Sequence, residues 1–310
     1  MPYRFQHDDG TVEAGVRRIA CEQIDRAIAE IDDPDLPRAQ AVHQVRKRCK
    51  KLRGLIRLVR PVFDDYGREN AVCRDAAKPL AELRDAAVHV ETYDMLVETY
   101  ADQIDRRALG SVRRRLTLRR KATERVVDAE ARIAEMRNSM VELRGRASRW
   151  RLKADGFEAV AGGLGRTYKR ARKTMAKARG RPGPERLHEW RKRAKYHWYH
   201  ERLLRPVWSK PMKAHADAAD DLGELLGDHH DLAVFRDTIA AEPKAFGRIE
   251  DVETLIGLIE RRQAELEARS FVAGARLFAE PGDALKARWG SYWSTWREAS
   301  TPPRRAALVA

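Results

Sequence analysis

An internal repeat is the feature of this sequence that most constrains its fold. The segment Val42–Lys50 (VHQVRKRCK) matches Leu187–Lys195 (LHEWRKRAK) at an offset of 145 residues, and each copy is followed by an Arg-Pro-Val segment. This offset far exceeds the repeats of about 20–50 residues that build solenoids and propellers. The repeat therefore predicts two copies of one helical unit, an N-terminal bundle over residues 1–150 and a C-terminal bundle over residues 151–310.

The spacing of the apolar residues predicts an all-α fold. From Val12 to Ile31 they recur every three or four residues, which marks one buried helix face. Trp289, Trp293 and Trp296 have the same spacing and predict a packing face. Since sustained alternation of apolar and polar residues is absent, we expect two tandem antiparallel helical bundles related by an approximate two-fold internal symmetry. The remaining predicted helices are 38–59, 66–101, 104–144, 155–178, 184–204, 212–240, 249–275 and 281–298.

The charge balance indicates a polyanionic partner. The chain has 62 Lys and Arg residues against 47 Asp and Glu residues, a formal net charge of +15. Its 43% of hydrophobic residues provide a core, which excludes a disordered basic tail. No apolar run reaches the roughly 18 residues of a membrane span, no secretory signal is visible, and the three cysteines form no CxxC pair. We expect a cytoplasmic protein with no membrane association, no cofactor and no bound metal.

Each copy of the repeat places a ladder of cations on one helix face. At about 100° per residue, these cations fall on one flank and the apolar residues on the other. Like charges one turn apart oppose a helix by a few tenths of a kcal/mol per pair, and the ladders carry almost no acid. Repelling cations at two equivalent places therefore indicate an external anion. The first ladder comprises His43, Arg46, Lys47, Lys50, Arg53 and Arg57, and the second comprises His188, Arg191, Lys192, Lys195 and Arg202.

The helix that precedes each ladder carries further cations. A short loop at 179–184 predicts that the second pair of helices packs antiparallel and forms a cationic groove, which concentrates a polyanion. A separate run, 106–121, holds eight cations and no acid, and either extends this groove or forms a separate surface or a mobile loop. The cations of the preceding helices are Arg17 and Arg18 in the first half, and Arg166, Lys169, Arg170 and Lys173 in the second.

The doubled motif His-x-x-Arg-Lys-x-x-Lys, with an Arg/His-Asp-x-x-Val segment downstream of each copy, resembles the CHAD family, the conserved histidine α-helical domain. The resemblance spans essentially the whole chain. It implies two helical bundles with approximate two-fold symmetry that bind inorganic polyphosphate on a basic surface without catalysis, with association to polyphosphate granules. The copies differ at Gly54 against Tyr199 and at Arg84 against His230, so whether both contribute equally is left open. The matching motif positions are His43, Arg46, Lys47, Lys50, His188, Arg191, Lys192 and Lys195.

The residue types suit a phosphate polymer. Arg offers a planar fork to phosphate oxygens, and Lys acts as a mobile point charge. A histidine among cations is neutral but gains a proton beside a bound phosphate. We therefore expect binding to tighten as the pH falls through about 6 to 7, if His43 and His188 contact the ligand.

Two other functions remain open from the sequence. Basic helices also bind nucleic acids, and Tyr196, Trp198 and Tyr199 on or beside the second ladder leave base stacking possible. A metal-dependent phosphohydrolase is the less favoured alternative. It would use His230-Asp231 together with His188 and Asp228.

Overall fold

In a computed structural model of the chain, residues 3–76, 81–104, 109–126 and 129–299 are described, without the side chains at 81–85, 124–126 and 129. Over these residues the fold is all-α, with no strand and no helix long and apolar enough to span a membrane. Three short 3-10 helices accompany the α-helices: η1 (His7–Asp9), η2 (Arg60–Val62) and η3 (Arg205–Trp208). The α-helices are α1 (Val12–Asp32), α2 (Arg38–Leu58), α3 (Tyr66–Asp75), α4 (Ala81–Thr99), α5 (Gly110–Val126), α6 (Ala129–Ala147), α7 (Gly156–Gly180), α8 (Pro184–Leu204), α9 (Ser209–Ala241), α10 (Pro243–Phe246), α11 (Ile249–Leu277) and α12 (Gly282–Glu298).

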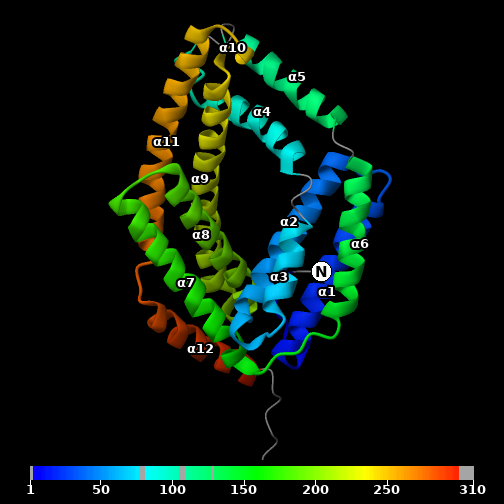
Figure 1. Cartoon of the computed structure of the whole chain (residues 1–310). Coiled ribbons are helices and arrows are strands. Elements are labelled where there is room, and N and C mark those ends of the chain that lie inside the picture. Colours follow the sequence, from blue (N-terminus) through cyan, green and yellow to red (C-terminus); the bar gives the residue numbers. More distant parts are fainter. Residues whose placement is uncertain (1–2, 77–80, 105–108, 127–128, 300–310) are drawn as a thin grey trace, which may run out of the picture.

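Two separate buried cores hold the helices together. The larger core joins α1, α2, α6, α7, α8 and α12, and Trp190 and Trp289 are its largest fully buried side chains. The smaller core joins α4, α5, α10 and α11. The long helix α9 reaches both, because its Leu226 lies in the larger core and its Leu232 in the smaller one. In Figure 1, helices α4, α5 and α10 of the smaller core lie at the top of the molecule, helices α1, α7 and α12 of the larger core lie at the bottom, and α9 and α11 run between them.

Two predicted helices are each divided in two, which corrects the sequence prediction. The stretch 66–101 forms α3 and α4, and the stretch 104–144 forms α5 and α6. Pro79, which has no backbone N–H to continue a helix, stands in the sequence between α3 and α4. No such residue marks the second division. There, α5 packs on α4 and α10 whereas α6 packs on α1, so the two helices serve different cores.

The apolar faces predicted for the ladder helices and for α12 are confirmed. Val45, Leu52 and Ile56 of α2 are fully buried, as are Trp190 and Ala194 of α8. Because these faces point into the larger core, the opposite flank of α2 faces outward, whereas the opposite flank of α8 lies against α9. That core contains side chains from both halves of the chain, and the division into bundles at residue 150 stays a prediction.

Two close helix crossings fix the end of α2 between α7 and α8. At the first, a Cβ added to Gly54 of α2 would lie 2.7 Å from the Cβ of Tyr199 on α8. At the second, a Cβ on Gly163 of α7 would lie 1.8 Å from the carbonyl oxygen of Leu58. Only glycine allows backbones to approach this closely. The pairs α1–α2 and α7–α8, which we call the first and second hairpins, thereby become neighbours (Figure 1).

Candidate anion-binding site

Five arginines line one pocket where the two hairpins meet. They come from three segments that the crossings bring together: the end of α2 with η2, the middle of α7, and α8. Gly163, Thr167 and Tyr196 complete the lining. We call the five arginines the arginine pocket: Arg57, Arg60, Arg166, Arg170 and Arg193.

The arginine pocket has a strongly positive potential. Burial lowers the pKa of Arg170, and the charges of the four other arginines lower it further. Charges of the same sign disfavour the protonated form, although a guanidinium remains protonated at any ordinary pH. The free energy of this repulsion is available to any anion that enters the pocket.

Carboxylates compensate little of this charge. In the described part of the chain, the carboxylate that pairs with the arginine pocket is Glu189, 3.5 Å from Arg193, and it also pairs with Lys192. Arg57 instead lies over the ring of Tyr196, 4.0 Å from its centroid. A ring satisfies the face of a guanidinium and leaves the N–H groups at its edge for an acceptor.

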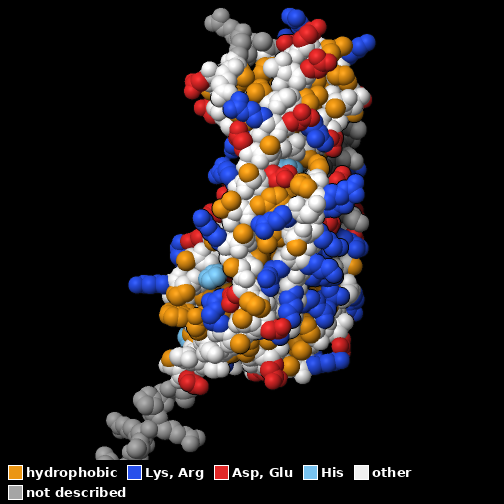
Figure 2. All heavy atoms as spheres, turned by 90° about the vertical axis from the view of Figure 1, so that its left-hand side faces the viewer, with side chains coloured by type: hydrophobic (Ala, Val, Ile, Leu, Met, Phe, Trp, Pro, Cys, Tyr) orange, Lys and Arg blue, Asp and Glu red, His pale blue; other side chains and the backbone are white. Residues whose placement is uncertain are grey.

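The surface around the pocket is basic as well. Figure 2 shows Lys and Arg side chains gathered along the right-hand side of the lower half of the molecule, in the part that holds α7 and α8. Acidic side chains are scattered over this view instead of gathering in one patch. Lys173 of α7 is exposed and forms no ion pair with a carboxylate of the described residues, so it adds to the charge beside the pocket.

The first ladder runs along α2 into the arginine pocket. His43, Lys47 and Lys50 are exposed, and Arg46 is half-buried. Arg53, one turn before Arg57, donates from Nε to Oδ1 of Asn70 over 3.1 Å. At 1.5 Å per residue, His43 and Arg57 are about 21 Å apart along the helix axis. The ladder is therefore an exposed cationic stripe with the pocket at its end.

The second ladder packs against α9 instead of facing solvent. Its Lys195 donates to Asp220 of α9 over 2.9 Å, and its Lys192 pairs with Glu189 of its own helix. A Cβ added to Gly227 of α9 would lie 3.3 Å from Arg191. This ladder is half-buried and partly neutralised, which the sequence did not indicate. Arg202, its last member, lies over the Trp198 ring at 4.8 Å from the centroid.

Histidine 188 faces another histidine. The rings of His188 and His230 lie 3.9 Å apart between centroids. Burial lowers the pKa of both to about 4, and nearby charges, including Arg191 and Lys192, add to the shift. His188 is thus neutral at pH 6 to 7 in the free protein. A bound phosphate would have to raise its pKa from about 4, which moves the expected pH window for this residue downward.

Three other predicted binding residues lie in ion pairs within the protein. Arg17 pairs with Glu13 at 2.6 Å and donates from Nε to the Trp150 carbonyl oxygen. Arg18 pairs with Asp9 and Glu22, and Lys169 pairs with Asp283 at 2.8 Å. Glu13 and Glu22 lie one turn away on the same helix, whereas Asp9 and Asp283 come from other elements, so the positions of the last two could not be read from one helix. We leave these three residues out of the site.

The basic run 106–121 forms a separate surface over its described residues. They lie on α5, at the end of the molecule opposite the arginine pocket (Figure 1). Arg113 pairs with Asp94 at 2.7 Å, and Arg119 lies 3.6 Å from Glu242. Arg106 and Arg107 lie outside the described residues, as do the side chains of Arg84 and Asp85.

Two members of the pocket, Arg60 and Arg193, were missed by sequence reasoning. Five residues after His188, Arg193 points about 140° away from it at 100° per residue and so falls outside the ladder sector. That direction faces α7, which is why it reaches the pocket. Arg60 belongs to the Arg-Pro-Val segment of the repeat. Its recurrence 145 residues later as Arg205 was the signal available.

The residues of the hydrolase alternative do not form a metal site. In the portion of the chain that is described, no group of three or more His, Cys, Asp or Glu side chains is placed to hold a metal ion. His188 and His230 stack on each other. The residues that the sequence pattern suggested, His188, Asp228, His230 and Asp231, therefore do not form such a group in the described structure.

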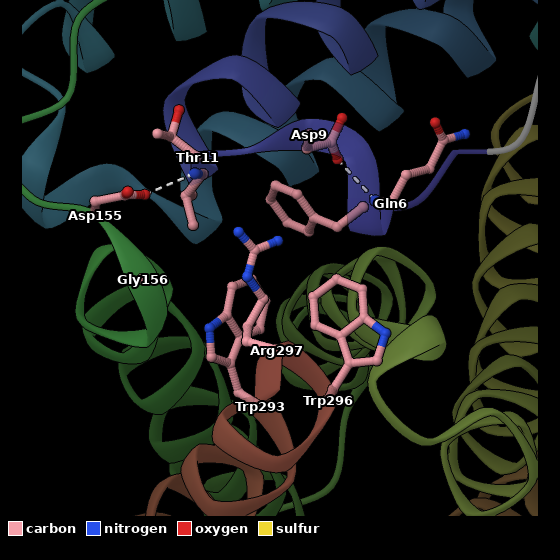
Figure 3. A pocket seen from close by; sticks show the side chains of 10 residues that line it. Gln6, Asp9, Thr11, Asp155, Gly156, Trp293, Trp296 and Arg297 are labelled. Carbon is pink, nitrogen blue, oxygen red and sulfur yellow. Dashed lines mark hydrogen bonds between the residues drawn. The ribbon is translucent and has the colours of Figure 1, made fainter. Parts of the chain in front are cut away.

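A second pocket, shown in Figure 3, serves to join chain segments. It lies between the N-terminal segment, the start of α7 and α12, and is lined in part by Trp293 and Trp296. Its polar groups are used internally: Arg297 donates to the Gly10 carbonyl oxygen over 2.6 Å, and Asp155 accepts from the backbone N–H of Val12 over 2.6 Å. The carboxylates in its lining make it unsuited to an anion.

The comparisons with known proteins agree with the sequence motif. A family model described as the CHAD domain matches residues 18–240, which include both ladders and the arginine pocket. This chain belongs to the CHAD domain family. Helices α11 and α12 lie beyond the matched residues of the CHAD domain, so the tryptophan face of α12 that closes the larger core is outside the family match.

Two solved structures share the fold of this CHAD domain. A crystal structure of the CHAD domain from the plant Ricinus communis matches with a TM-score of 0.61 and 20% identity, covering 90% of this chain and 94% of that one. PptA from Streptomyces chartreusis matches with a TM-score of 0.59 and 16% identity, covering 87% and 98%. Among proteins with curated descriptions there is no match. At these identities the likeness concerns the fold.

Proposed function

We propose that this CHAD domain binds inorganic polyphosphate, without catalysis, through the arginine pocket and the exposed ladder of α2. The observation that carries the proposal is the pocket itself, in which five guanidinium groups meet and Glu189 is the paired carboxylate among the described residues. Internal ion pairs normally neutralise arginines placed this close together. An external polyanion is the compensating partner that this arrangement lacks.

The chemistry of the site fits a polymer of phosphate. Each phosphoryl unit carries an anionic oxygen, and a guanidinium binds two such oxygens at once. The exposed cations of α2, among them Lys47 and Lys50, extend the contact along about 21 Å of helix. A flexible anionic chain can follow this stripe, whereas a compact anion would use the pocket alone.

Nucleic acid is the weaker candidate because the aromatic rings near the site are covered by cations. Tyr196 carries Arg57 on its face at 4.0 Å, and Trp198 carries Lys195 at 4.3 Å. Tyr199 is buried against Gly54. Binding of single strands relies on stacking bases on open aromatic faces, and these three rings do not offer them.

The two halves of the chain are, in our proposal, two bundles related by an approximate two-fold axis. Gly54 and Tyr199 occupy equivalent positions, 145 residues apart, and contact each other where α2 crosses α8. A two-fold axis brings equivalent residues together only where they lie close to the axis. Arg57 lies over the ring of Tyr196, and the residues equivalent to this pair are Arg202 and Lys51. The pKa of Lys51 is lowered to about 8, first by burial and then by the charges of Arg48 and Arg202, so Arg202 lies near Lys51. These reciprocal contacts support the two-fold relation. Association with polyphosphate granules in the cytoplasm is the role that such a binder would serve.

A binding titration tests the proposed function. Long-chain polyphosphate is titrated into the wild-type protein and into R60A/R166A/R170A, which removes three pocket arginines. We expect the affinity of the variant to fall at least thirtyfold at 0.1 M salt. The matched control K244A/R248A/R276A removes three cations that are exposed on α10, α11 and the loop between them, and we expect it to lose less than threefold.

Equal losses in the two variants would show that net charge, and not the pocket, governs binding, and would contradict the proposal. A competition experiment then separates the ligands. Polyphosphate should displace duplex DNA at a phosphate concentration at least tenfold lower than that at which DNA displaces polyphosphate. Release of phosphate from polyphosphate in the presence of Mg²⁺, Mn²⁺ or Zn²⁺ would contradict a role without catalysis.

A further inference from the structure

We infer that the arginine pocket holds the end of a polyphosphate chain, while the ladder of α2 holds its interior. This inference rests on the proposed function and adds a specificity to it. It concerns the terminal phosphate group, which differs from interior units in charge and in having no onward chain. Two features of the pocket carry it: one side is closed by helix contact, and its charge density is higher than that of the ladder.

The pocket is closed at the end away from the ladder. Helix α7 crosses the end of α2 so tightly that a Cβ on Gly163 would overlap the Leu58 carbonyl oxygen. On the preceding residue, a Cβ on Gly162 would lie 2.9 Å from the ring of Pro61. A chain that enters along α2 therefore meets the wall of α7 and η2 beyond the arginines. An interior segment would need an exit there, whereas a chain end does not.

The charge of the pocket matches a terminal group better than an interior one. A terminal phosphoryl group carries about −1.5 to −2 charges at pH 7, with a second pKa near 6, whereas an interior unit carries about one. The ladder of α2 presents its cations at intervals of three or four residues along one face, but the pocket gathers five arginines from three segments around one space. The part of the site with the most closely spaced cations therefore suits the part of the ligand with the highest negative charge.

Tripolyphosphate, which consists mostly of ends, provides the direct test. We expect it to bind the wild-type protein at one site and to lose at least tenfold in affinity with R166A/R170A. The control K244A/R248A removes two exposed cations from the opposite end of the molecule, and we expect less than a twofold loss. Failure of tripolyphosphate to bind, or equal losses in both variants, would overturn the inference.

Long chains with blocked ends separate this inference from the proposed function. Both terminal phosphates are converted to phosphoramidates, which removes their second ionisation. We expect the blocked chain to bind the wild-type protein at least fivefold more weakly than the free chain of the same length. We also expect R166A/R170A to bind the two alike. Equal affinity of the wild-type protein for both would overturn end recognition while leaving polyphosphate binding intact. Absence of binding by either chain would instead contradict the proposed function.

Two further measurements define the ligand class. Since the terminal group gains its second charge near pH 6, tripolyphosphate should bind more tightly as the pH rises from 5.5 to 7.5. A flat or opposite dependence would overturn the assignment. ATP shares a terminal triphosphate group, but one end of it is esterified. ATP that bound as tightly as tripolyphosphate would overturn the assignment to an inorganic chain.

Discussion

The two hairpins of this CHAD domain carry the same cationic motif but neutralise their cations at different places. In the first hairpin the ladder on α2 is exposed, while Arg18 and Arg48 are held by carboxylates. In the second hairpin the ladder is half-buried on α9, while Arg166 and Arg170 open into the arginine pocket. The exposed positive charge therefore lies on the ladder of the first hairpin, and in the second hairpin the flanking helix α7 contributes Arg166 and Arg170 to the pocket.

The difference comes from a few acidic residues. Glu22 stands one turn after Arg18 on α1 and pairs with it, whereas Arg170 stands one turn after Arg166 on α7. Arg48 of α2 pairs with Glu30 at 2.5 Å, whereas the equivalent Arg193 of α8 has Glu189 at 3.5 Å. A repeated cationic motif thus does not by itself mark a binding site. The placement of its acidic neighbours decides which copy of a cation remains available.

The largest expected effect on polyphosphate affinity comes from adding to α7 of the second hairpin a carboxylate that pairs with an arginine, as Glu22 does on α1 of the first hairpin. In R170E the new carboxylate would pair with Arg166 one turn away, as Glu22 pairs with Arg18. We expect a loss of about thirtyfold in polyphosphate affinity, or about 2 kcal/mol, measured by titration at fixed salt. The control R276E reverses one exposed charge on α11. If it lost as much, the contrast between the hairpins would have no bearing on binding.

Acid should weaken the packing of the second hairpin on α9, where three histidines are buried. The pKa values of His188, His229 and His230 are lowered to about 4 by burial, below the ordinary value of about 6.5. Between these values the unfolded chain binds protons that the folded chain does not, so the free energy of unfolding falls as the pH drops from about 6.5 to 4. We expect a loss of about 1–3 kcal/mol, measured by urea unfolding.

Variants assign this pH dependence to its source. H188Q/H230Q should reduce the pH dependence, because neither glutamine titrates and only His229 of the three remains. H43Q, which changes the exposed histidine of α2, should leave it unaltered. A pH profile of the H188Q/H230Q variant that matched the wild type would place the titrating groups elsewhere.

Stability should also separate the two equivalent ion pairs. The side chains of Arg48 and Glu30 are 12% and 20% exposed, so E30Q leaves a partly buried guanidinium without its charge partner. We expect E30Q to lower the free energy of unfolding by about 1–2 kcal/mol. Glu189 is 46% exposed, and we expect E189Q to cost less than about 0.5 kcal/mol. Denaturant midpoints measure both, and similar costs would refute the distinction between the pairs.

The smallest expected effect compares the lysines of the two ladders. K47A/K50A removes two exposed cations, and we expect polyphosphate affinity to fall about fivefold, or about 1 kcal/mol. K192A/K195A removes lysines already paired with Glu189 and Asp220, and we expect about twofold. A larger loss for the second variant in the same titration would show that the buried ladder opens to the ligand.

Much of the architecture was predictable because it depends on the spacing of apolar residues within single helices. The periodicity of α2 and α8 correctly indicated their buried faces, down to Val45 and Trp190. The division between α5 and α6 was missed because it depends on which core each helix joins, and no proline or glycine marks it. Within the site, Arg57, Arg166 and Arg170 were identified from their helix faces, whereas Arg193 needed the position of α7.

The sequence by itself determined an all-α chain of the CHAD family with two cationic ladders, because helical periodicity and motif spacing are properties of neighbouring residues. The tertiary structure alone decided which of those cations remain available. Asp220 neutralises Lys195 and Asp283 neutralises Lys169 across helix contacts, and Gly163 lets α7 close against α2. Pairing and packing of this kind join residues far apart in the chain. For that reason the sequence shows a net charge of +15, but only the fold shows that part of this charge is gathered in the arginine pocket.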